Sequence, residues 1–260
     1  MPALPYSIAV LVSTLVAAAL GVALRRRIFA GKPDEAVSAS ITAALGLGST
    51  LTAIVLGMVT ASAKDTYDQA NELVAGLAVD AITLDKILDN YGPETAPIRD
   101  ALKKDVEFRI NRLESPETYH LADLVAAAGV PRVEALWSKV AALTPASPVQ
   151  DQLQFRALDM IGGRVGFGEG NMAQKRWLFT VRPVSIPMVF LAVVLGWLVL
   201  EFFCFGLFSK ARTAFTLALV ASSLIVASTM FLILELDDPI DGYFHVSAEP
   251  LRRALELLNM

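Results

Sequence analysis

The densest cluster of groups that could do chemistry lies near the C-terminal end, where four acidic residues fall within seven positions. The cluster and its turn comprise Glu235, Asp237, Asp238, Pro239, Asp241 and Gly242. Carboxylate oxygens are the ligands that Ca²⁺ prefers, and Asp238 and Asp241 flank a proline turn that could bring them together. The same groups could instead be hydrated or paired with Arg252 or Arg253, because an isolated buried carboxylate would be neutralised. A metal site and a simple structural turn both remain open.

A second chemically notable residue is Glu201, which lies inside the apolar run "WLVLEFFCF". An ionisable group in hydrocarbon costs at least about 2.5 kcal/mol on insertion scales. We therefore expect Glu201 to be a membrane-embedded charge that faces protein, water or a partner. Its place about seven residues before the end of the run also allows it to approach the headgroup region.

Enzymatic and nucleic-acid-binding patterns are missing from the sequence. There is no H-E-x-x-H, G-x-S-x-G or Walker-type glycine loop, and the two histidines have no metal-ligand spacing. The glycine-rich stretch 162–171 resembles a hinge more than a phosphate loop. A net charge of −4 argues against nucleic acid as a partner. We predict no catalytic residues and no cofactor.

The elements that must hold these residues are membrane helices. Hydrophobic residues make up 55% of the 260 residues and charged residues 18%, with a mean hydropathy of +0.54. Four apolar segments are long enough to cross a bilayer: 7–24, 41–63, 184–208 and 213–236. The first is not a signal peptide, because the basic run Arg25 to Arg27 follows it instead of preceding it.

About 120 polar residues separate the second and third segments and read as helices without any strand pattern. The predicted fold class is therefore an all-α membrane protein with four transmembrane helices and a helical extramembrane domain inserted between the second and third. The expected parts are 1–63 (first helix pair), 64–183 (helical domain), 184–236 (second pair) and 237–260 (acidic turn and amphipathic helix).

The second segment continues without a breaker from Thr42 to Tyr91, so its helix should extend far beyond the bilayer. Helical spacing places Thr42, Ser49, Ala53 and Thr60 on one small or polar face, which we interpret as pore-lining. A neighbouring face with Gly46, Thr50, Ala53 and Gly57 suits close helix contact. Both faces also fit ordinary packing between membrane helices, so the two interpretations stay open.

The C-terminal stretch "FLILELDDPIDGYFHVSAEPLRRAL" resembles uncharacterised bacterial membrane proteins described as bestrophin-like domain proteins. The matching positions are Glu235, Leu236, Asp237, Pro239, Ile240, Gly242, Val246 and Ser247. The third span, "DNYGPETAPIRDALKKDV" and "KRWLF" are similar to the same family, so the resemblance runs from about Leu45 onward. Glu201 departs from it, since an apolar residue is expected there, and the glycine-rich loop resembles an insertion.

A looser resemblance links this family to the bestrophins themselves, which are pentameric anion channels lined by the second span. It implies a homo-oligomer in the lipid bilayer that conducts ions. The acidic region after the last span binds Ca²⁺ in animal bestrophins, but Asp238, Pro239, Ile240 and Gly242 match that pattern only loosely.

The expected function is a homo-oligomeric ion channel of bestrophin-like architecture, and the resemblance implies that it conducts anions. The alternative is a non-conducting membrane-anchored interaction or sensor protein that acts through its helical domain. The expected location is the bacterial inner membrane, with several passes. Basic residues in both short loops, among them Lys32, Lys210 and Arg212, place those loops in the cytoplasm and the helical domain outside, whereas bestrophin topology implies the reverse.

Overall fold

The computed structural model describes residues 3–28, 35–114, 130–162, 186–208, 213–239 and 243–260. All regular structure in these residues is helical, as predicted. The chain divides into two compact units. The first comprises 1–66 and 184–238, and the second comprises 67–183 and 239–260.

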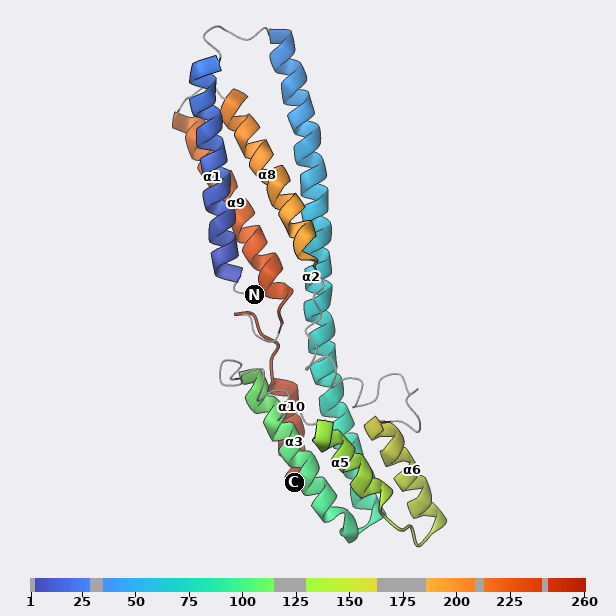
Figure 1. The fold of residues 1–260 in the computed structure, drawn as a ribbon. Coiled ribbons are helices and arrows are strands. Elements are labelled where there is room, and N and C mark those ends of the chain that lie inside the picture. Colours follow the sequence, from blue (N-terminus) through green and yellow to red (C-terminus); the bar gives the residue numbers. More distant parts are fainter. Residues whose placement is uncertain (1–2, 29–34, 115–129, 163–185, 209–212, 240–242) are drawn as a thin grey trace. The chain divides into compact units, whose positions relative to one another are not determined.

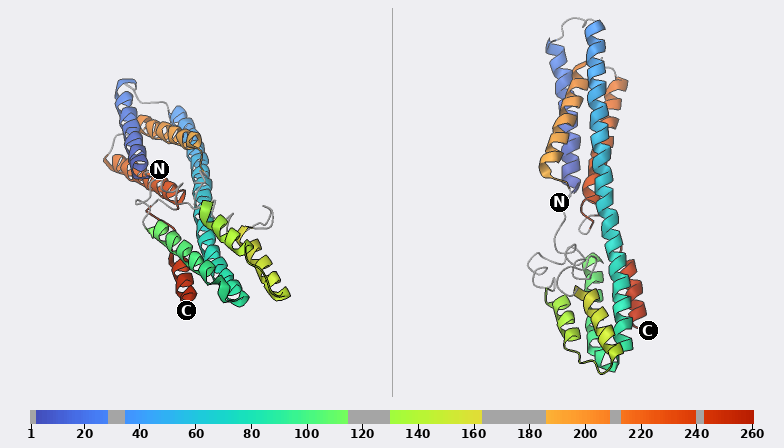
Figure 2. Two further views of the ribbon diagram at one scale, coloured as in Figure 1. Left: turned by 60° about the horizontal axis from the view of Figure 1, so that its bottom comes forward. Right: turned by 90° about the vertical axis from the view of Figure 1, so that its right-hand side faces the viewer.

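The first unit contains four helices that are long and apolar enough to cross a membrane. They are α1 (Ala3–Ile28), the first part of α2 (Glu35–Tyr91), α8 (Met188–Phe208) and α9 (Thr213–Leu236). Their ranges contain most of each predicted span, so the predicted membrane helices are confirmed as elements. Within this unit α1 packs against both α8 and α9 (Figure 1 and Figure 2).

Glycine allows α1 and α8 to approach each other closely. A Cβ atom on Gly206 would collide with the backbone carbonyl of Ala18, and one on Gly21 would collide with that of Phe203. Small residues at such crossings are typical of membrane helix packing, where van der Waals contact replaces the hydrophobic effect. The α1–α8 contact therefore depends on two glycines that are 185 residues apart in the sequence.

A buried hydroxyl pair joins α1 to α9. The side-chain oxygens of Thr14 and Ser223 lie 2.6 Å apart, and both residues are fully buried. Thr14 also donates to the carbonyl of Val10 on its own helix at 2.8 Å. In hydrocarbon a hydroxyl without a partner is costly, so this bond fixes which faces of α1 and α9 meet.

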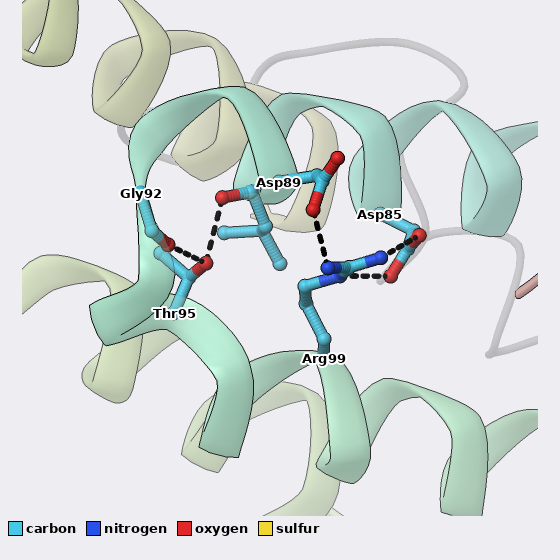
Figure 3. A network of polar contacts seen from close by, with 6 residues as sticks. Asp85, Asp89, Gly92, Thr95 and Arg99 are labelled. Atoms are coloured by element: carbon cyan, nitrogen blue, oxygen red, sulfur yellow. Dashed lines mark hydrogen bonds and ion pairs between the residues drawn. The ribbon is translucent and has the colours of Figure 1, made fainter. Parts of the chain in front are cut away.

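The helix α2 is continuous over 57 residues and ends at Tyr91, as the sequence predicted. Gly92 has φ of +145°, a conformation that side chains disfavour, and Pro93 follows it. Beyond the turn, the buried hydroxyl of Thr95 donates to the carbonyls of Leu88 at 2.6 Å and Gly92 at 2.7 Å (Figure 3). Both carbonyls also accept a backbone N–H, from Gly92 and Thr95 respectively, so the hydroxyl adds a second donor to each at the end of the helix.

An arginine clamp holds the same corner. Arg99 donates through Nε and Nη2 to both carboxylate oxygens of Asp85, at 2.7 and 2.8 Å (Figure 3). A third donor, Nη1, contacts Asp89 one turn further along α2. The hydrogen bond with Asp85 raises the pKa of Arg99. Bidentate arginine–carboxylate pairs of this kind fix the relative orientation of the two side chains. The Arg99–Asp85 pair therefore helps to determine the direction of α3 relative to the end of α2.

The second unit builds its core from the end of α2 and from several shorter helices. These are η1 (Pro93–Thr95), α3 (Ala96–Glu114), α5 (Val130–Ala141), α6 (Pro148–Gly162) and α10 (Glu249–Leu258). Fully buried side chains from these helices form one cluster that includes Leu77, Leu84, Leu102, Val140, Ile161 and Leu251. The glycine-rich stretch 162–171 lies, apart from Gly162, outside the described residues.

The last helix begins at Glu249, with Ala248 at the N-cap position. Ser247 Oγ accepts the backbone N–H of Glu249 at 3.2 Å. Ala248 is buried in the core of the second unit.

Candidate functional site

The membrane part of α2 is the most exposed helix surface of its unit. In its most apolar window 6% of the residues are buried, compared with 33% in α1 and 22% in both α8 and α9. Four large apolar side chains, Leu47, Leu51, Ile54 and Met58, are each more than half exposed along one face. A helix exposed in this way needs lipid or other protein around it.

The small-residue face predicted on α2 is likewise open. Gly46, Thr50, Ala53 and Gly57 are all exposed, and a Cβ atom on Gly46 or Gly57 would meet no atom within 4 Å. Thr50 donates its hydroxyl to the carbonyl of Gly46, at 2.8 Å, so its hydrogen bond stays within α2. Within the part of the chain that the structure describes, no other helix therefore occupies the surface beside the two glycines.

The predicted pore-lining residues share one face of this continuous helix but differ in exposure. Thr42 and Ala53 are exposed, whereas Ser49 and Thr60 are half-buried. The Thr60 hydroxyl donates to the carbonyl of Leu56, at 2.8 Å. Among the described residues, Ser49 Oγ is buried and has no hydrogen-bond partner. Their role in lining a pore stays a prediction.

Glu201, the predicted membrane-embedded charge, is half-buried on α8 and faces α2. Thr52 donates its hydroxyl to Glu201 Oε1 at 2.6 Å. The same oxygen would lie 3.6 Å from a Cβ atom on Gly48, so the side chain sits against the helix surface at that glycine. Thr52 was not among the residues singled out from the sequence. The only signal for it was that a carboxyl group within a membrane span, such as that of Glu201, needs a partner.

The acidic turn begins in the first unit and is partly buried there. Glu235 is 3% exposed, and Asp237 and Asp238 are half-buried. Burial, and then the charge of Asp238, raise the pKa of Asp237 from 3.8 to about 6. Pro239 is buried in the second unit, where its carbonyl accepts the backbone N–H of Val246 at 2.9 Å. Asp241 and Gly242 lie outside the described residues.

The two arginines suggested as partners of this turn have carboxylate partners within the second unit. Arg252 pairs with Glu114 at 2.6 Å, and Arg253 pairs with Glu249 at 2.9 Å. Over the described ranges, no three His, Cys, Asp or Glu side chains gather as metal ligands. A metal site at Asp238 and Asp241 remains a prediction, because Asp241 is not among those residues.

The described residues thus form four apolar helices, a helical unit that includes the end of the second, and the start of an acidic turn after the fourth. The model of the bestrophin-like domain family matches residues 12–251. The chain belongs to the bestrophin-like domain family. None of the curated proteins compared with it matches.

A solved structure shows the same fold as this bestrophin-like protein. It is the crystal structure of a point mutant of a bacterial bestrophin homolog from Klebsiella pneumoniae. The two share 15% sequence identity with a TM-score of 0.61, and the match covers 97% of this chain and 99% of the other. At that identity the likeness concerns the fold, which is the one expected from the sequence resemblance.

Proposed function

We propose that this bestrophin-like protein is a homo-oligomeric ion channel in which α2 lines the conducting path. This proposal rests on the exposed surface of α2, since 6% of the residues in its most apolar window are buried. Copies of α2 arranged around an axis would cover Gly46, Thr50 and Gly57 and leave the neighbouring face with Ala53 toward the path. The family membership supports this architecture. Five subunits and anion conduction rest on the resemblance to bestrophins alone.

One side of α2 contacts α8 of the same subunit, so that side cannot point to the axis. Thr52 contacts α8, and at about 100° per residue Ala53 lies about a quarter-turn from it. Thr50 lies almost opposite Thr52. We therefore propose that the lining comprises the face of Thr42, Ser49, Ala53 and Thr60, with the exposed Thr42 and Ala53 the most accessible.

Ion flux in liposomes tests this function. The purified protein should conduct chloride or a monovalent cation, and a charged, water-soluble thiol reagent should reduce the flux when Ala53→Cys is introduced in a Cys204→Ser background. The same reagent should leave the Val55→Cys variant unaffected, because Val55 is half-buried and lies on a different side of α2. Absence of flux from a folded protein would favour the interaction or sensor function.

The orientation in the membrane follows from the charge count and is also part of the proposal. The helical unit is then outside the cytoplasm. A cysteine at the exposed Asn111 should react with an impermeant maleimide on intact spheroplasts. Reaction only after lysis would establish the orientation that bestrophin topology implies.

A further inference from the structure

The contact between Thr52 and Glu201 differs from the other hydroxyl contacts described for α2 in this unit. Thr50 and Thr60 donate to carbonyls of α2 itself, each at 2.8 Å. Thr52 donates instead across the helix boundary to a carboxyl oxygen on α8, at 2.6 Å. Thr52 is 4% exposed, so this bond is shielded within the chain.

The rest of the described packing holds α2 at a second point. Two turns beyond Thr52, Val59 and Ala63 are buried in an apolar cluster with Val10, Met230 and Ile233. That contact is apolar and therefore not directional, whereas a hydrogen bond to a carboxyl group has a fixed geometry. Gly48 borders the site, since a Cβ atom there would lie in ordinary van der Waals contact with Glu201 Oε1, at 3.6 Å. A rotation of α2 would carry Thr52 away from Oε1.

We propose that Glu201 is a positioning residue that fixes the rotation of α2 about its own axis through Thr52. The chemical requirement is an acceptor oxygen at residue 201 and a hydroxyl donor at residue 52. The hydroxyl can donate to either a charged or a protonated carboxyl. The consequence for conduction rests on the proposed function, because it requires α2 to line the path. The positioning itself does not depend on conduction.

The test uses the full chain in lipid nanodiscs and compares two threonines of the same helix. Thr52→Val removes the hydroxyl that reaches α8, and Thr50→Val is the matched control, since its hydroxyl bonds within α2. Thr52→Val should lower the melting temperature by about 1–2 °C. It should have no effect in a Glu201→Leu background, where the acceptor is already lost. Thr52→Ser and Glu201→Gln retain donor and acceptor and should behave like the wild type.

A second measurement reports the orientation of α2 directly. The labelling rate of Ala53→Cys, in a Cys204→Ser background, should change when Thr52→Val is added and should not change with Thr50→Val. In liposomes Thr52→Val should also alter ion flux severalfold. If the wild type shows no flux but the thermal coupling and the labelling change are present, the positioning contact stands and the channel function fails.

Two results would overturn the inference while leaving the channel intact. One is a Thr52→Val effect of the same size with and without Glu201, which would show that the two side chains are not coupled. The other is Glu201→Gln behaving like Glu201→Leu, which would show that the negative charge acts and the hydrogen bond does not.

Discussion

Two polar pairs in the membrane unit link side chains of different helices. Thr14 meets Ser223, and Thr52 meets Glu201, both at 2.6 Å. In hydrocarbon such pairs contribute on average about 0.6 kcal/mol each, which is too little to hold a bundle together. Each pair instead determines how its two helices are oriented, because the hydrogen bond forms in only one arrangement of these helices.

At the edge of the membrane unit, Asp237 should make stability depend on pH. Its pKa is raised from 3.8 to about 6, so the folded protein binds this proton more tightly than the unfolded chain does. Stability from this group is therefore fully present below about pH 4 and is lost as the pH rises to about 6.

Thermal unfolding between pH 4 and 7 checks this dependence. The melting temperature of Asp237→Asn minus that of the wild type should increase as the pH rises from 4 to 6. Above pH 6 this difference should stay constant. Asp159→Asn, at an exposed position of α6, is the control and should follow the wild type. A constant difference between Asp237→Asn and wild type across the whole range would contradict the assignment.

At the scale of elements, the helices followed from the sequence because their signals are local. Apolar runs of sufficient length marked the four spans, and the lack of a breaker between Thr42 and Tyr91 indicated that α2 extends beyond the second span. Packing could not be read in the same way, because its partners are far apart in the chain. Glu201 predicted that a partner exists, but 149 residues separate it from Thr52 and nothing local points to that residue.

The crossing of α1 and α8 gives a prediction for elements. Gly206→Ala should force these helices apart, because the new Cβ atom would meet backbone and not a flexible side chain. We expect a cost of about 1–3 kcal/mol, seen as a lower melting temperature in detergent. Gly196→Ala on the same helix is the control, since nothing lies within 4 Å of its Cβ position. Equal melting temperatures for the two variants would contradict the close crossing.

At the scale of the whole molecule, the chain carries a membrane helix that its own fold leaves mostly uncovered. The first part of α2 is more exposed than α1, α8 and α9. Its last part lies in the core of the helical unit. One continuous helix therefore belongs to both units. A partner that rearranged the helical unit would act on the same helix that we propose to line the path.

The central claim is that several copies assemble with α2 at their symmetry axis. A cryo-EM reconstruction of the full chain in lipid nanodiscs tests it most directly. We expect a closed ring of at least three subunits, with α2 of every subunit facing the axis and α8 behind it. A monomer, a dimer, or a ring in which α2 faces the lipid would contradict it.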